Sequence, residues 1–257
     1  MPALPAYRRH TIYTGRPSER TLCLVGDLNR DGVPEIVVGA RKPQAELLWL
    51  GRAAVPTGGA WQAHRIDDGF GSLESGGVLF DVDGDGDLDL IAGQDYQGDR
   101  LFWWECPDDP AQPWTRHEIA RMPANQSHNQ LVADLDGDGG PELYFWNQRA
   151  DTLFGVPIPD DPHVSPWPGI IPVATSVREE GLAMADLDGD GRPELIAGCS
   201  WYRPPSGPGD AWERHVFAEG YVAPQVVAAD FDGDGQVEIV VAEGDASLHK
   251  RPFGRVA

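Results

Sequence analysis

The chain has 257 residues and a formal net charge of −21, with 41 acidic against 20 basic residues. This acidic balance argues against nucleic-acid binding, and no apolar run reaches the roughly 18 residues that a helical membrane span needs. Cys23, Cys106 and Cys199 are scattered without a CxxC spacing, which argues against a disulfide framework and a thiolate zinc site.

The N-terminal segment lacks a basic stretch followed by an apolar one, so the sequence as given carries no signal peptide and would be cytoplasmic as written. Within this segment, residues 7–13 contain an aromatic residue followed three positions later by His10. The same pattern returns later in the chain at the start of predicted strands.

A nine-residue acidic loop then occurs five times. In chain order, the first to fifth acidic loops are residues 27–35 (DLNRDGVPE), 81–89 (DVDGDGDLD), 134–142 (DLDGDGGPE), 186–194 (DLDGDGRPE) and 230–238 (DFDGDGQVE). They hold 20 of the 41 acidic residues, so the net charge is almost wholly a property of these loops. Acid concentrated in compact loops indicates bound cations rather than an evenly acidic surface.

Short apolar runs flank each acidic loop, for example TLCLVG and EIVVGA around the first, and they predict a β-hairpin whose turn is the loop. A third apolar run follows, as in LLWLG, LFWWE and CSWYR. A fourth begins with an aromatic-x-x-His pattern: Trp61 to His64, Trp114 to His117 and Trp212 to His215. Because His10, His64, His117 and His215 recur at matching positions, we expect them to pack or to form hydrogen bonds rather than to bind metal.

Four strands per unit and a regular repeat predict an all-β chain, a β-propeller in one domain. The first aspartates of the loops lie 54, 53, 52 and 44 residues apart, as expected for propeller blades. Five four-stranded blades are predicted, approximately at residues 16–67, 68–121, 122–174, 175–218, and 219–257 completed by 1–15. The N-terminal strand would close the ring by joining the C-terminal blade. A truncated seven-bladed propeller remains an alternative, because the third unit has only Trp167-Pro-Gly-Ile-Ile in place of Trp-x-x-His.

The acidic loops have the composition of calcium cages. Calcium takes about six to eight oxygen ligands, and positions 1, 3, 5 and 9 offer side chains while position 7 offers its backbone carbonyl. Position 6 is always Gly, and position 12 is always apolar, which excludes an EF-hand. Up to five calcium ions are predicted, with the first site the weakest, because Asn29 replaces an Asp and Arg30 adds positive charge. The predicted ligands are Asp27, Asn29, Asp31, Val33, Glu35, Asp81, Asp83, Asp85, Asp87, Asp89, Asp134, Asp136, Asp138, Gly140, Glu142, Asp186, Asp188, Asp190, Arg192, Glu194, Asp230, Asp232, Asp234, Gln236 and Glu238.

These loops resemble the FG-GAP (VCBS) repeats of integrin-type calcium-binding β-propellers over nearly the whole chain. Partial matches to the FG-GAP motif, after which the family is named, occur at Phe70-Gly71 and at Gly39-Ala40. The resemblance implies a calcium-stabilised propeller used for binding, often outside the cell, although this sequence lacks a leader. The Trp-x-x-His strands are also similar to propeller modules attached to carbohydrate-active enzymes.

A ligand is expected at the end of the ring opposite the acidic loops, where polar and aromatic residues precede the first strand or follow the second strand of each unit. The candidates for ligand binding are Gln94, Asp95, Tyr96, Asn129, Asn147, Trp201 and Gln225. If the protein is an enzyme, His128 with Glu74 and Glu179 or Glu180 could supply a general base and acid.

Three functions follow from this pattern. A binding module for a glycan or a protein, acting as a monomer, is favoured over an enzyme. The alternatives are a carbohydrate lyase, dehydratase or hydrolase with its site at the channel mouth, and a purely structural or assembly propeller.

Overall fold

A computed structural model describes residues 8–15, 19–41, 45–52, 60–123, 125–207, 210–244, 254 and 256–257. The described chain is all-β apart from one short 3-10 helix, η1, at Gln148–Ala150. None of its helices has the length and apolar character that crossing a membrane requires.

The strands form four four-stranded antiparallel sheets and one two-stranded sheet, each built from consecutive strands. The first sheet is β1 (Arg20–Gly26), β2 (Glu35–Ala40), β3 (Leu47–Arg52) and β4 (Trp61–Asp67). The second is β5 (Val78–Phe80), β6 (Asp89–Gly93), β7 (Arg100–Glu105) and β8 (Thr115–Arg121). The third is β9 (Ser127–Ala133), β10 (Glu142–Asn147), β11 (Thr152–Pro157) and β12 (Ile171–Thr175). The fourth is β13 (Leu182–Ala185), β14 (Glu194–Ala197), β15 (Ser200–Arg203) and β16 (Glu213–Val216), and the fifth is β17 (Pro224–Ala229) and β18 (Glu238–Glu243).

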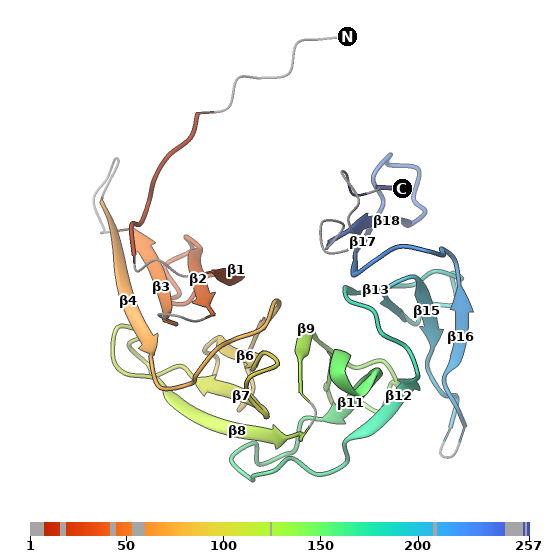
Figure 1. Cartoon of the computed structure of the whole chain (residues 1–257), viewed down its shortest axis with the longest axis horizontal. Helices are drawn as coiled ribbons and strands as arrows, with labels where there is room; N and C mark the ends of the chain where they lie inside the picture. The colour runs from red at the N-terminus through yellow and green to blue at the C-terminus, as the bar shows by residue number, and fades with distance from the viewer. Residues whose placement is uncertain are drawn as a thin grey trace.

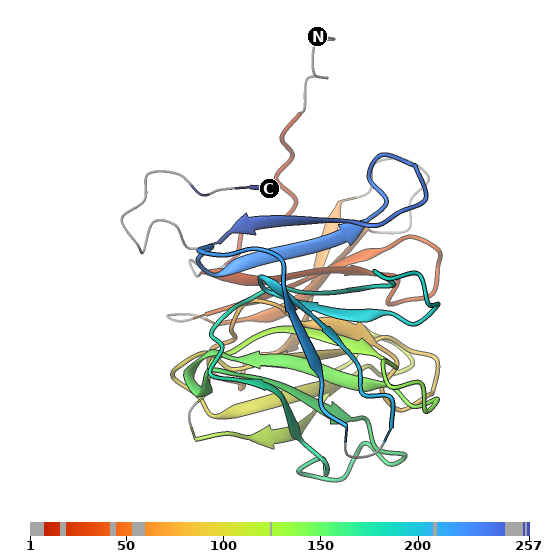
Figure 2. The ribbon, with the colours of Figure 1, turned by 90° about the vertical axis from the view of Figure 1, so that its right-hand side faces the viewer.

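The five sheets lie around one centre, with the first strand of each sheet innermost (Figure 1). Contacts between neighbouring sheets accordingly join β1 to β5, β5 to β9, β9 to β13 and β13 to β17. Every acidic loop connects the first strand of its sheet to the second, as the sequence predicts. The five loops therefore project from the same side of the molecule, seen edge-on in Figure 2.

The core consists of apolar layers between adjacent sheets. Trp49 and Val37 of the first sheet pack in one cluster with Leu90 and Trp104 of the second. Similar clusters join the second sheet to the third and the third to the fourth. The second strands β6, β10 and β14 are buried along their whole length, which explains why a run such as LYFW in β10 is apolar without alternation.

The recurring histidines stack on tryptophans of the neighbouring strand. The ring centroids of Trp49 and His64 are 4.1 Å apart, those of Trp103 and His117 4.4 Å, and those of Trp201 and His215 3.9 Å. Each pair occupies directly opposite positions on the third and fourth strands of its sheet. These three histidines therefore pack against tryptophans, as the sequence predicts.

The predicted closure of the ring is not confirmed. Residues 8–15 form no strand, and Tyr7 lies outside the described residues. Tyr13 instead contacts the first sheet, where its hydroxyl lies 3.5 Å from a carboxylate oxygen of Glu46 and Arg20 lies over its ring. The fifth sheet is extended by the C-terminus, since Val256 forms a β-bridge to Ala242 of β18.

Candidate functional site: acidic loops, central network and pocket

All five acidic loops are held by their own carboxylates. In the second loop, Asp81 accepts hydrogen bonds from the backbone of Gly84 and Gly86, at 2.8 and 3.0 Å. The position-9 carboxylate accepts a bond from the backbone N–H at position 2, which joins the end of the loop to its start. This contact is 3.0 Å for Asp89, and it recurs for Glu35, Glu142, Glu194 and Glu238 at 2.9, 3.2, 2.8 and 2.8 Å.

Two positions of each loop adopt the left-handed backbone conformation. Position 6 has φ between 84° and 95° in all five loops, which explains the invariant Gly. Position 4 is also left-handed, and it is Gly in the second to fifth loops but Arg30, at φ 58°, in the first. Sequence reasoning missed this second requirement, although the DGDG pattern carries it.

Carboxylate oxygens converge in four of the loops. The sets Asp134, Asp136, Asp138 and Glu142, and Asp230, Asp232, Asp234 and Glu238, each place one oxygen per residue within 4.8 Å of all the others. Asp81, Asp83 and Asp85 do the same in the second loop, and Asp186, Asp188 and Glu194 in the fourth. The first loop gives no such group among the described residues. Its Asn29 side-chain nitrogen lies 3.3 Å from Asp31 Oδ2 and 3.2 Å from Glu35 Oε1.

The position-9 carboxylates of the first four loops are buried, whereas Glu238 of the fifth is half-buried. Burial raises the pKa of Asp89 to about 7, against the opposing effect of hydrogen bonds from Cys106 and Val82. Burial likewise raises the pKa of Glu142 to about 7, with a further contribution from Asp136 and Asp134. A carboxylate in this setting is costly to ionise without a cation beside it.

Arginines connect neighbouring loops. Arg30 of the first loop pairs with Asp87 of the second at 2.9 Å, and the Asp87 side chain is 2% exposed. Arg192 of the fourth loop donates to the backbone oxygens of Leu135 and Asp136, in the third loop, at 3.4 and 3.2 Å. Position 7, predicted to contribute only a backbone carbonyl, thus also carries side chains that join adjacent loops.

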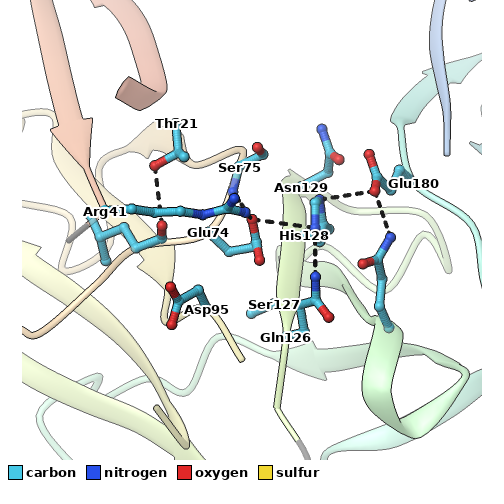
Figure 3. Close-up of polar contacts among 12 residues, drawn as sticks. Thr21, Arg41, Glu74, Ser75, Asp95, Gln126, Ser127, His128, Asn129 and Glu180 are labelled. Carbon is cyan, nitrogen blue, oxygen red and sulfur yellow. Dashed lines mark hydrogen bonds and ion pairs between the residues drawn. The ribbon is translucent and has the colours of Figure 1, made fainter. Parts of the chain in front are cut away.

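Next to the start of the first strands and the end of the second strands lies a polar cluster, here called the central network, whose contacts Figure 3 shows. It takes one residue from each sheet or the segment next to it: Arg41, Glu74, His128, Glu180 and Gln225. Arg41 pairs with Glu74, and His128 lies between the two glutamates, with its Nε2 3.4 Å from Glu74 and its Nδ1 3.6 Å from Glu180. Gln225 donates to Glu180 at 2.9 Å.

The proposed catalytic residues fall partly inside this network. His128, Glu74 and Glu180 are 5%, 1% and 6% exposed, so little of their surface faces solvent. Glu179 points elsewhere and accepts a hydrogen bond from the backbone of Cys199 at 2.9 Å. Gln148, which follows β10, donates to Glu180 at 2.6 Å.

The residues predicted to bind a ligand make several different kinds of contact. Asn129 and Gln225 lie together, with 3.3 Å between their side-chain amides. Gln94 donates to the backbone of Phe70, Asp95 accepts from the backbone N–H of Gln97 and Asn147 caps η1, so these three stabilise the backbone locally. Trp201 stacks on His215, and Tyr96 is 56% exposed.

A pocket of about 550 Å³ lies at the side of the acidic loops, between the third sheet and the β15–β16 connection. Three carboxylates of the third loop line it: Asp136, Asp138 and Glu142. Tyr144 and Trp212 also line it, and their rings meet edge to face with centroids 5.7 Å apart. Sequence reasoning missed this pocket, since its walls come from two different units and depend on how these pack.

Comparison with known proteins gives one family match. Residues 81–145 match the model of the FG-GAP-like repeat. No curated protein matches the chain.

Among solved structures, the V. cholerae biofilm matrix protein Bap1 is similar with a TM-score of 0.51 and 17% identity. The similarity covers 93% of this chain and 37% of Bap1, so the chain spans little more than a third of that protein. An endo-arabinase from Bacteroides thetaiotaomicron VPI-5482 is similar with a TM-score of 0.44 and 10% identity over 93% of each chain. Because only 17% of the residues are identical, the similarity to Bap1 concerns the fold alone. The chain therefore contains an FG-GAP-like repeat at residues 81–145, the stretch that carries the second and third acidic loops, within a propeller-like all-β fold.

Proposed function

We propose that this chain is a calcium-stabilised β-propeller module that binds carbohydrate in the pocket beside the third acidic loop. One observation supports both parts. Asp136, Asp138 and Glu142 belong to a set of converging carboxylates and also line a pocket that contains Trp212.

The calcium part rests on the donor set. Three or four carboxylates and the position-7 carbonyl are hard oxygen ligands, and water can complete the coordination of a calcium ion. Magnesium suits these loops less, because it keeps its own water molecules and avoids all-protein cages. Up to five ions are proposed, with the weakest site in the first loop, where the amide of Asn29 replaces a carboxylate.

The carbohydrate part rests on the pocket. Its volume lies within the range of about 300–1,000 Å³ typical of small-ligand sites. An aromatic ring offers a flat apolar face to a sugar ring, while carboxylates and backbone groups accept hydrogen bonds from its hydroxyls. The face that the sequence favoured is less suitable, because His128, Glu74 and Glu180 of the central network expose little of their surface to a ligand.

Binding to an array of immobilised glycans, measured in calcium and in EGTA, tests this function. We expect calcium-dependent binding that is lost in Trp212→Ala and kept in Trp201→Ala, which removes a tryptophan of β15 that does not line the pocket. Thermal unfolding of both variants checks that they remain folded. Binding that survives Trp212→Ala, or an array without any bound glycan, would contradict the proposal.

A second candidate function is catalysis at the central network, favoured by the position of His128 between two glutamates. An imidazole between carboxylates can move a proton as a general base and acid. The glycans found on the array would be the substrates to test, and loss of their cleavage in His128→Gln with retained binding would support an enzyme. Unchanged glycans would refute it.

A further inference from the structure

A cluster of two histidines and a glutamate lies outside the acidic loops and the central network. Glu105, His117 and His163, here called the histidine cluster, each place one ligand atom within 4.8 Å of the other two. The His117 Nε2 atom lies 2.8 Å from Glu105 Oε2, and the His163 Nε2 atom lies 3.5 Å from the same oxygen. Three atoms with lone pairs thus converge on one point.

Two neighbouring sheets build this cluster. Glu105 is the last residue of β7 and His117 lies in β8, while His163 comes from the β11–β12 connection of the third sheet. Trp167 fixes this connection against the second sheet, because its side chain is buried there and its backbone donates to Ile119 at 2.8 Å. Its ring nitrogen donates to the oxygen of Pro162, next to His163, at 2.8 Å.

The surroundings orient both imidazole rings. His117 stacks on Trp103, and the rings of His117 and His163 meet at 84° with centroids 5.1 Å apart. The Nδ1 atom of His163 lies 3.2 Å from Asp161 Oδ1. A carboxylate at Nδ1 keeps the proton there and leaves Nε2 free to act as a ligand, an arrangement typical of metal-binding histidines.

The packing role of the recurring histidines does not account for this cluster. His64 and His215 stack on their tryptophans as His117 does, but neither belongs to a potential metal-binding group among the described residues. Both ring nitrogens of His163 face carboxylate oxygens, yet a neutral imidazole has only one N–H to donate. A cation held between Glu105 and the two Nε2 atoms satisfies the second contact.

We propose that Glu105, His117 and His163 bind a zinc ion that joins the second and third sheets. Two imidazoles and a carboxylate suit zinc, whereas calcium and magnesium prefer oxygen ligands alone. Zinc bonds of about 2.0–2.1 Å place tetrahedral ligand atoms roughly 3.4 Å apart, near the separations in the cluster. The side chains of Glu105, His117 and His163 are 32%, 20% and 47% exposed, which leaves a fourth position for water.

Calorimetric titration of the full chain with zinc chloride, in excess calcium to occupy the acidic loops, tests the site. We expect one tight site in the wild type, at least a tenfold loss of affinity in His163→Ala, and no loss in the matched control His215→Ala. His163 is half-exposed, so its replacement should leave the fold intact, and Glu105→Gln provides a second variant.

Cobalt provides a separate readout of the ligands. Cobalt bound at the cluster should give the visible absorption of a four- or five-coordinate ion, and zinc should displace it while calcium does not. Equal zinc affinity in the wild type and His163→Ala would overturn the proposal, as would an absence of tight binding. Displacement of zinc by calcium would assign the binding to the acidic loops and would also overturn it.

Discussion

At the scale of single residues, Arg30 combines an unfavourable backbone with a favourable charge. Its φ of 58° lies where the other four loops have Gly, and a side chain there costs about 1–2 kcal/mol. Its guanidinium pairs with the buried Asp87 of the next loop. Burial raises the pKa of Asp87, and Arg30 opposes that rise, so the arginine helps to keep the carboxylate ionised.

Replacing Arg30 separates the two effects. Arg30→Gly relieves the backbone strain but leaves a buried carboxylate without its partner, a loss that usually exceeds the strain. We expect a net fall of about 1–2 kcal/mol in the free energy of unfolding by urea, in calcium. Adding Asp87→Asn to Arg30→Gly should recover stability. If Arg30→Gly alone is more stable than the wild type, the backbone strain outweighs the charge pair.

Glu179 gives a prediction for pH. Burial raises its pKa above the ordinary value of 4.5, against the opposing effects of the Cys199 N–H and Arg214. The folded state then holds this proton more tightly than the unfolded state, so ionisation costs stability as pH rises through the interval above 4.5. Glu179→Gln should therefore gain stability relative to the wild type between acidic and neutral pH.

Urea unfolding of both proteins at several pH values measures this difference. Glu219→Gln, at an exposed position, is the matched control and should follow the wild type. A constant difference between Glu179→Gln and the wild type across the range would contradict the assigned cause.

At the scale of the acidic loop, the position of a residue decides whether its side chain or its backbone carbonyl would bind calcium. In the fifth loop, Asp232 at position 3 is a proposed calcium ligand, whereas Gln236 at position 7 would offer only its carbonyl. Asp232→Ala should lower the unfolding free energy in calcium by about 2–3 kcal/mol, the contribution of one well-occupied site, and have little effect in EGTA.

Gln236→Ala in the same loop serves as the control and should behave as the wild type in calcium. Its side chain makes only a long contact with Asp234, at 3.4 Å. Equal losses in the two variants would mean that the assignment of side-chain and backbone ligands is wrong.

The loops also show how far sequence reasoning reaches. The strands on either side of each loop follow from local pattern, since apolar runs and the turn are adjacent in the chain. The packing role of His64 was likewise predictable from its repetition. The contacts of Arg30 with Asp87 and of His163 with Glu105 were not, because they join different units and depend on how neighbouring sheets pack.

Closure of the ring likewise depends on contacts between distant segments, which sequence reasoning does not predict. The pattern at residues 7–13 predicts a strand, although residues 8–15 form none, and it does not select an edge for pairing. Among the described residues, Tyr13 contacts the first sheet through Arg20 and the adjacent Glu46. Pairing with a distant edge depends on three-dimensional position, which the pattern of one segment does not contain.

At the scale of the whole molecule, apolar layers hold the sheets together, with arginine contacts between acidic loops on one side and the central network on the other. The proposed calcium ions would act in the loops on the first side, where the converging carboxylates repel one another without a cation. We therefore expect EGTA to lower the melting temperature by ten degrees or more, on the order of several kcal/mol for several sites.

Differential scanning calorimetry in calcium and in EGTA measures this effect. Restoring calcium should restore the melting temperature, and added magnesium at the same concentration should not. An unchanged melting temperature in excess EGTA would refute structural calcium.

The third acidic loop forms part of the wall of the pocket, and Asp136, Asp138 and Glu142 belong to both. Thermodynamic linkage then makes the two binding events reciprocal: if the ion strengthens binding of a sugar, the sugar must strengthen binding of the ion by the same factor. With such positive coupling, a ligand in this pocket would lower the calcium concentration at which the third loop empties. The module would then release the sugar when the calcium concentration falls, and the other loops would lose their ions at a different calcium concentration.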